Sequence, residues 1–201
     1  MDLYLVRHAE TYGNTGADDS ADPVLTERGR KQAKLLAARL AELPFDAVFC
    51  SPLLRAVTTA QEILSRQQSA LPVELVPELM EHQPPQDYCG LPTKKLQKIC
   101  PTAVYPDRHT LPQETDETAL ERAHYVIRYV RERFPEGNVL LVAHGQFNTY
   151  LLLAAMGLPK PDGFNFSQRN ACLDRILFLP DGRTKAKLVN DVSHLQEEMW
   201  T

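Results

Sequence analysis

The stretch Leu3-Tyr4-Leu5-Val6-Arg7-His8-Ala9-Glu10-Thr11 changes abruptly from apolar residues to charged and polar ones. Its short apolar run, residues 3–6, is typical of a buried strand. In open α/β sheets, ligands bind beyond the carboxyl ends of the strands. An arginine and a histidine that directly follow such a strand are therefore candidates for a binding or catalytic site.

Short apolar runs alternate with helical patterns along the whole chain. Strands are predicted at residues 3–6, 45–50, 73–76, 139–143, 172–179 and 185–189. One predicted helix is capped by Thr26 and buries Ala33, Leu36, Ala37 and Leu40. A second follows Ser51, a third begins at the capping-box pair Thr118 and Glu121, and a fourth covers 147–156. This alternation predicts an α/β fold: a three-layer sandwich with a mostly parallel central sheet and helices on both faces.

Residues 82–117 interrupt the alternation, because they contain six prolines and little periodicity. We expect an inserted cap segment that lies away from the sheet and contributes to specificity, since loops over a rigid sheet often do so. Residues 1–201 would then form a single domain with its specificity insertion at 82–117.

Composition excludes several classes of protein. The 201 residues are 43% apolar and 24% charged, as in an ordinary globular domain. The net charge is -4, and no basic stripe indicates a nucleic-acid partner. The chain has neither a signal-peptide pattern at its start nor an apolar run long enough to span a membrane, which predicts a cytoplasmic protein. Its four cysteines form no CxxC pair, so they indicate neither zinc binding nor a disulfide framework.

Three predicted strands end in residues suited to phosphate. The first ends in Arg7-His8, the second precedes Ser51 and Arg55, and the strand at 139–143 ends at His144. A phosphate monoester is roughly a dianion near neutral pH, and guanidinium groups bind its oxygens in a planar fork. Backbone N–H groups at the helix starts after these strands would add further donors. We expect the four cationic or donor side chains to lack paired anions in the empty site.

The same residues carry a resemblance to a known family. The motifs are Leu5-Val6-Arg7-His8-Ala9-Glu10-Thr11 with Asn14, Leu25-Thr26-Glu27-Arg28-Gly29 with Gln32, Ser51-Pro52-Leu53 with Arg55, Val142-Ala143-His144-Gly145, and Asn190-Asp191 with His194. Together they resemble the histidine phosphatase superfamily, the phosphoglycerate mutase-like group. The resemblance runs through most of the chain and fails only in the middle segment. One departure is Ala9, where the family usually has glycine.

The resemblance implies a set of roles for these residues. His8 would attack phosphorus and form a phosphohistidine intermediate. Arg7, Arg55 and His144 would hold the non-bridging oxygens, and Asn14 would be a further donor. His144 would thus belong to both the catalytic and the phosphate-binding set. The reaction would require no metal and no cofactor.

A carboxylic acid would protonate the leaving oxygen, and its conjugate base would then activate water. In the family this acid follows a Leu-x-Glu pattern after the third strand. Leu79-Met80-Glu81 matches, so Glu81 is the predicted acid, with Glu78 as its rival. His8 must be neutral to attack while Glu81 must be protonated to donate, which predicts a bell-shaped dependence of rate on pH.

The predicted function is hydrolysis of a phosphorylated small molecule. A phosphomutase is the first alternative, although residues 82–117 contain only four fixed positive charges, Lys94, Lys95, Lys98 and Arg108. A non-catalytic phosphate-binding module is the second alternative. Such a module would be expected to lose one of the two histidines or two arginines, and all four are present. The substrate and the oligomeric state remain open at this stage.

Overall fold

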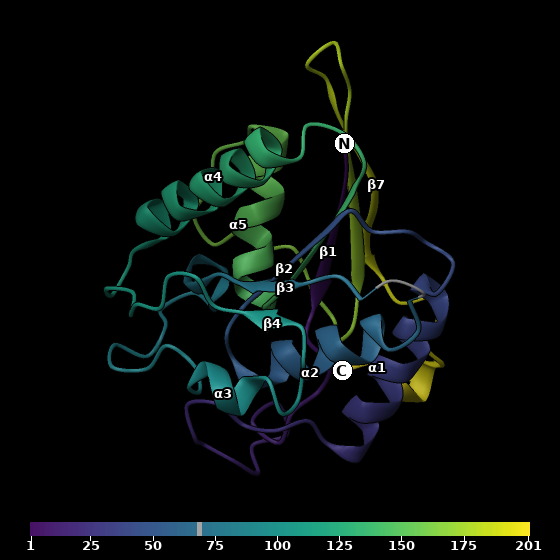
Figure 1. Ribbon diagram of the computed structural model, residues 1–201. Coiled ribbons are helices and arrows are strands. Elements are labelled where there is room, and N and C mark those ends of the chain that lie inside the picture. The colour runs from purple at the N-terminus through teal and green to yellow at the C-terminus, as the bar shows by residue number, and fades with distance from the viewer. Residues whose placement is uncertain (68–69) are drawn as a thin grey trace.

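Across residues 1–67 and 70–201, which the computed structural model describes, seven strands form one central sheet (Figure 1). The strands are β1 (Asp2–Arg7), β2 (Ala47–Cys50), β3 (Val73–Leu75), β4 (Ala103–Val104), β5 (Asn138–Ala143), β6 (Leu173–Phe178) and β7 (Thr184–Asp191). Their order across the sheet is β4-β3-β2-β5-β1-β6-β7. All neighbours pair in parallel except at β6, which is antiparallel to both β1 and β7. The prediction of a mostly parallel sheet is confirmed.

Helices cover both faces of this sheet. They are α1 (Glu27–Leu40), α2 (Leu54–Leu64), α3 (Thr93–Leu96), α4 (Asp116–Arg133) and α5 (Gly145–Met156), with short 3-10 turns η1 (Pro77–Leu79) and η2 (Glu197–Met199). Strand β1 shows how the layers arise, because Tyr4 and Val6 pack in one apolar cluster with α1 and α2. Leu3 and Leu5 point to the other face and pack with α4 and α5. The three-layer arrangement follows from this alternation.

Local sequence explains how helix α1 begins. The Oγ1 atom of Thr26 accepts a hydrogen bond from the backbone N–H of Gly29 at 2.9 Å, as predicted for an N-cap. Gly29 is required for another reason: a Cβ atom there would lie 2.0 Å from the carbonyl oxygen of Glu10. The helix can therefore approach the loop that follows β1 only because this position has no side chain.

The predicted start of helix α4 is wrong by three residues. Thr115, not Thr118, is the N-cap, and the helix begins at Asp116. Thr118 occupies the third helical position, where its Oγ1 accepts from the N–H of Thr115 at 2.9 Å. A threonine hydroxyl thus fills the place that the sequence analysis gave to Glu121.

The segment 82–117 was expected to lie away from the sheet, but part of it joins the sheet. Its strand β4 pairs with β3 at the sheet edge, through Ala103 opposite Val73. Leu96, Cys100 and Ala103 are fully buried and belong to the same apolar cluster as α1 and α2. These few apolar residues stand in a proline-rich segment and were too sparse to give a periodic signal.

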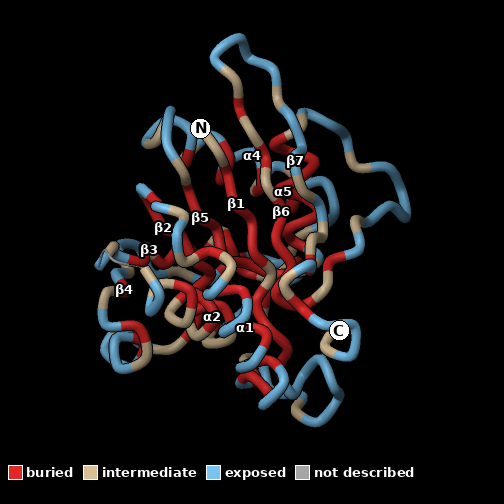
Figure 2. Tube along the Cα trace, turned by 90° about the vertical axis from the view of Figure 1, so that its right-hand side faces the viewer, coloured by how far each residue is buried: buried red, intermediate tan, exposed pale blue. Residues whose placement is uncertain are grey.

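The register of three central strands positions the site. Arg7 at the end of β1 lies opposite Ala143 at the end of β5, and Cys50 at the end of β2 lies opposite Val142. The three strands are buried along most of their length (Figure 2). Residues that follow them therefore meet at one edge of the sheet. None of the helices within the described residues is long and apolar enough to cross a bilayer.

Candidate active site

His8 directly follows β1 and is buried, with 3% of its surface exposed. Its Nδ1 atom lies 2.8 Å from the carbonyl oxygen of Ala9. A carbonyl only accepts, so Nδ1 carries the proton and the lone pair of Nε2 remains free. Burial, followed by the charges of Arg55 and Arg7, lowers the pKa of His8 well below its usual value. The ring is therefore neutral near neutral pH and presents an unprotonated nitrogen.

His144 follows β5 and faces His8. The two ring centroids are 5.1 Å apart and the ring planes make an angle of 61°. The Nε2 atom of His144 lies 2.8 Å from Oγ of Ser51, which follows β2. Its Nδ1 atom is buried and has no hydrogen-bond partner within the described residues. Burial, and then Arg55, His8 and Arg7, lower the pKa of His144 well below its usual value.

The guanidinium of Arg7 lies at the start of helix α5. One Nη atom donates to the carbonyl oxygen of Gln168, while Nε is buried without a partner in the described chain. A Cβ atom at Gly145 would lie 2.9 Å from Nε of Arg7, so the glycine makes room for the guanidinium. Burial is the main cause that lowers the pKa of Arg7, and Glu81 opposes it. Arg7 therefore has unused donor capacity beside a carboxylate.

Arg55, in the first turn of α2, has a carboxylate partner that the sequence analysis did not identify. Its Nη1 atom lies 3.4 Å from Oδ1 of Asp22. Asp22 also accepts from the phenol of Tyr88 at 2.9 Å and from the backbone N–H of Leu54 at 2.9 Å. The expectation that the empty site lacks paired anions is therefore wrong at Arg55. Tyr88 ties the segment 82–117 to this pair.

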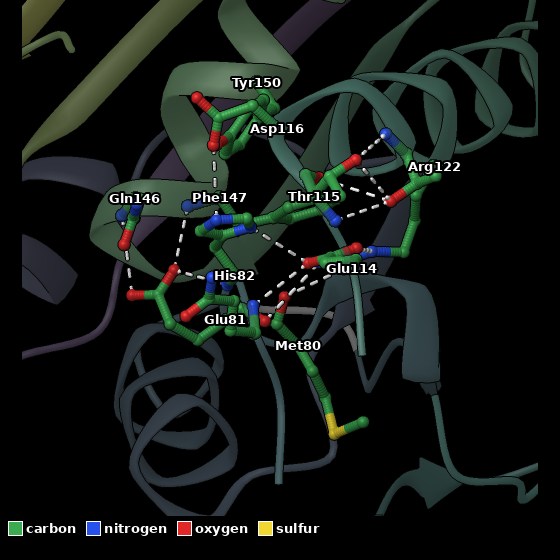
Figure 3. A network of polar contacts seen from close by, with 12 residues as sticks. Met80, Glu81, His82, Glu114, Thr115, Asp116, Arg122, Gln146, Phe147 and Tyr150 are labelled. Carbon is green, nitrogen blue, oxygen red and sulfur yellow. Dashed lines mark hydrogen bonds and ion pairs between the residues drawn. The ribbon is translucent and has the colours of Figure 1, made fainter. Parts of the chain in front are cut away.

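Glu81 and its predicted rival lie in different places. The Glu81 carboxylate accepts hydrogen bonds from the backbone N–H groups of His82 at 2.9 Å and Phe147 at 2.8 Å (Figure 3). It lies with Arg7 in a cleft of about 410 Å³. Glu78 instead lies 3.3 Å from Nε2 of His109 and lines a separate cleft. Of the two carboxylates, Glu81 is the one that shares a cleft with Arg7.

The helix starts are not the free anion sites that the sequence analysis expected. The N–H groups at the start of α5 donate to Glu81, and the N–H of Leu54 at the start of α2 donates to Asp22. No helix begins directly after His8; there the N–H of Ala9 donates to Oγ1 of Thr59 at 3.1 Å. Side chains from other elements thus accept from these backbone N–H groups. The guanidinium groups of Arg7 and Arg55 are therefore the main groups left to bind phosphate.

Asn14 is tied into the loop after β1. Its Oδ1 atom accepts from the backbone N–H and the hydroxyl of Thr11, each at 3.0 Å, and from Asn170 at 3.2 Å. Asn170 in turn donates to the carbonyl oxygen of His8 at 3.0 Å. Nδ2 of Asn14 donates no hydrogen bond within the part of the chain that the structure describes, so this amide keeps a free donor.

The departure at Ala9 is accommodated by the core. Ala9 is fully buried and belongs to the apolar cluster that also contains Leu25 and Ala33. Its methyl group thus fills space between the loop and helix α1. Glu10 is equally structural, because its carboxylate accepts from Thr26 at 2.6 Å and pairs with Arg28 at 2.9 Å.

The assembled set can hold an anion and attack it. Two neutral imidazoles face each other, two arginines lower the pKa of both, and a carboxylate lies beside one arginine. Within residues 1–67 and 70–201, no group of three or more His, Cys, Asp or Glu side chains is arranged to hold a metal ion. A planar arginine fork and a ring nitrogen with a free lone pair are the groups that phosphoryl transfer through a covalent intermediate needs.

Comparison with known proteins shows the family to which this chain belongs. The model of the histidine phosphatase superfamily (branch 1) matches residues 3–192. The chain therefore belongs to this superfamily, as its motifs predicted.

Named relatives are phosphatases. The chain is 30% identical over 196 residues to the uncharacterized phosphatase PhoE of Bacillus subtilis (strain 168), and the match covers 95% of each chain. It is 29% identical over 189 residues to the adenosylcobalamin/alpha-ribazole phosphatase of Escherichia coli (strain K12), with 88% of this chain and 89% of the relative covered. The predicted enzyme class, a phosphomonoesterase, is confirmed by these matches.

Solved structures agree. The alpha-ribazole phosphatase from Shigella flexneri superposes with a TM-score of 0.71 at 27% identity, covering 95% of this chain and 96% of that chain. A phosphoglycerate mutase from Bacillus anthracis str. Sterne, 23% identical, gives a TM-score of 0.69 over 96% of this chain and 94% of its own, and so shares the fold.

Proposed function

We propose that this chain hydrolyses the phosphate monoester of a small molecule, with His8 as nucleophile. The observation that carries the proposal is the hydrogen bond from Nδ1 of His8 to the carbonyl of Ala9, which leaves Nε2 free beside His144. Arg7 and Arg55 hold the non-bridging oxygens of the phosphoryl group, and Asn14 supplies a further donor. Positioning and cationic stabilisation of this kind account for most of the catalysis in phosphoryl transfer.

In the first step, Nε2 of His8 attacks phosphorus in line with the ester oxygen. A P–N bond forms, the P–O bond to the leaving group breaks, and protonated Glu81 gives its proton to the departing oxygen. His144 donates from Nδ1 to a phosphoryl oxygen. The products of this step are phosphohistidine, the free alcohol and the Glu81 carboxylate.

In the second step, the Glu81 carboxylate takes a proton from water as the water attacks phosphorus. A P–O bond forms, the P–N bond breaks, and His8 and protonated Glu81 are regenerated with inorganic phosphate. Because the pKa of His8 is lowered, its ring stays neutral into the acidic range, as the attack on phosphorus requires. The two protonation demands still predict a bell-shaped rate profile.

The lining of the cleft supports a small substrate. Beyond Arg7 and Glu81 it consists of uncharged residues: Gly145, Gln146, Thr149, Asn165, Phe166 and Gln168. Relatives of this chain include alpha-ribazole phosphatases, whose named substrate is a small phosphorylated molecule. A cytoplasmic location and the absence of nucleic-acid and membrane partners stay predictions of the sequence. The segment 82–117 is proposed to contribute to substrate choice, since Tyr88 contacts the pair of Asp22 and Arg55.

A screen of phosphorylated metabolites, with wild type and His8→Ala side by side, tests the proposal. Wild type should release phosphate and carry an acid-labile, base-stable phosphoryl group after rapid quenching. His8→Ala should lose turnover by roughly 10⁴-fold or more and carry no label. Turnover that depends on a bisphosphate primer would instead indicate a mutase, and phosphate binding without turnover would indicate a binding module.

A further inference from the structure

The guanidinium of Arg122 contacts the turn that carries Glu81. Arg122 projects from α4, and only 9% of its side chain is exposed. Its Nη1 atom donates to the carbonyl oxygens of Glu78 at 2.6 Å and Met80 at 2.9 Å, and Nη2 reaches that of Glu81 at 3.4 Å (Figure 3). One guanidinium therefore contacts three carbonyls of the short turn that carries Glu81.

Glu114 binds both Arg122 and the residues that follow Glu81 in the same turn. Its Oε2 atom accepts from Nε of Arg122 at 2.9 Å. Its Oε1 atom lies 3.2 Å from Nδ1 of His82 and accepts from the backbone N–H of Gln83 at 3.1 Å. The residues just before and just after Glu81 are thus held by one ion pair, which leaves the backbone of Glu81 little freedom.

Phe147 joins this ion pair to the helix that follows His144. The guanidinium carbon of Arg122 lies 3.7 Å from the centre of the Phe147 ring. The backbone N–H of the same phenylalanine donates to the Glu81 carboxylate. Arg122 therefore contacts both supports of that carboxylate: the turn from which its side chain comes and the helix start on which the side chain rests.

We propose that Arg122, held by Glu114, is the positioning residue for the carboxyl group of Glu81. This inference rests on the proposed function, in which Glu81 protonates the leaving oxygen. A buried ion pair is by itself weak evidence of stabilisation. Here, however, both Nη atoms of the guanidinium also donate to backbone carbonyls of the one turn that carries Glu81. A displacement of about 1 Å in such a group can cost roughly 100-fold in rate.

Two substrates with different leaving groups can distinguish a misplaced Glu81 from a general loss of protein stability. An alkoxide is a poor leaving group and needs the proton of Glu81, whereas a dinitrophenolate leaves without one. The ratio kcat/KM reports only the steps up to formation of phosphohistidine, so the later use of Glu81 as a base does not enter. A variant with a misplaced Glu81 should therefore lose kcat/KM for an alkyl phosphate and keep it for 2,4-dinitrophenyl phosphate.

The experiment compares Arg122→Gln with wild type on these two substrates. We expect kcat/KM for the alkyl phosphate to fall roughly 10- to 100-fold and that for the dinitrophenyl ester to change by less than about threefold. Glu81→Gln should show the same selectivity. In the double variant the two losses should not add, because Arg122 acts through Glu81.

Arg133→Gln is the matched control. Arg133 lies on the same helix and also combines an ion pair, to Glu74 at 2.7 Å, with a nearby aromatic ring, that of Phe49, but it contacts no residue of the turn at Glu81. Arg133→Gln should leave unchanged the ratio of the kcat/KM value for the alkyl phosphate to that for the dinitrophenyl ester. If Arg122→Gln does not fold, Glu114→Gln gives the same readout with a smaller change.

Equal losses on both substrates, additive losses in the double variant, or an unchanged ratio would overturn the positioning role. These results differ from failure of the proposed function itself, in which wild type would hydrolyse neither ester.

Discussion

The Nε2 atom of His144 lies 2.8 Å from the hydroxyl oxygen of Ser51, which comes from the neighbouring strand end. That oxygen also accepts from the N–H of Leu53 at 3.4 Å, so its own proton is available to His144. A neutral His144 that accepts at Nε2 carries its proton on Nδ1, the nitrogen that has no partner among the residues the structure describes. Ser51 therefore fixes the tautomer that can donate to a phosphoryl oxygen.

Ser51→Ala should accordingly lower kcat/KM by roughly 10-fold, the value of one lost hydrogen bond. Steady-state kinetics with an aryl phosphate measures the loss. Ser65→Ala, which removes a hydroxyl that donates to the carbonyl of Glu62, is the control and should have no effect. Equal activity in wild type and Ser51→Ala would contradict this role for Ser51.

Gly145→Ala should weaken phosphate binding without unfolding the protein. The added methyl group would lie 2.9 Å from Nε and 3.2 Å from Cζ of Arg7, so the guanidinium must move. Alanine is otherwise the better helix former. We expect Kd for inorganic phosphate to rise roughly 10-fold, measured by calorimetry, with an unfolding midpoint close to that of wild type. Unchanged phosphate affinity would show that Arg7 does not bind it.

Acid should destabilise the folded protein because His8 and His144 are buried and neutral. Their pKa values are lowered from 6.5 in the folded state, so below about pH 6.5 the unfolded chain binds more protons than the native one. The free energy of unfolding then falls as pH falls, by up to about 1.4 kcal/mol per pH unit for each histidine. Urea titrations at pH 7.5, 6.5 and 5.5 measure this slope. His8→Asn should reduce it, and an unchanged slope would count against burial of a neutral ring.

Asp174 should have the opposite pH dependence. It is fully buried on β6, and burial raises its pKa from 3.8 to about 6, although hydrogen bonds from Asn190 and Gln168 oppose the shift. Its contribution to stability is present below pH 4 and is lost as pH rises through 6. Asp174→Asn should therefore be more stable than wild type at pH 8, by up to about 3 kcal/mol, and lose this advantage at pH 4.5. A constant difference between the two pH values would argue against a titrating Asp174.

Much of the site was predictable because its residues follow buried strands. His8, Arg55 and His144 stand directly or a few residues after the apolar runs that became β1, β2 and β5. Parallel strands bring their carboxyl ends to one edge, so proximity along the sheet follows from local patterns alone. Glu81 was predicted as the acid from the family resemblance instead, because its Leu-x-Glu context distinguished it from Glu78.

The supporting residues were not predictable in this way. Asp22 lies in a loop without periodicity, and Arg122 looks like an ordinary polar position on an amphipathic helix. Gln168, which accepts a hydrogen bond from Arg7, is 161 positions away from it in the chain. No local pattern marks such residues, because their partners are set by how loops and helices cross the edge of the sheet.

The sequence by itself determined the alternation of strands and helices, the family and the candidate phosphate-binding residues, since these depend on short-range patterns of apolar and polar residues. Only the tertiary structure decided which carboxylates cap helices α2 and α5, that β4 completes the sheet edge, and that Arg122 and Glu114 support Glu81. These features depend on hydrogen bonds and ion pairs between side chains distant in sequence. Such interactions need particular distances and directions, and the fold supplies both.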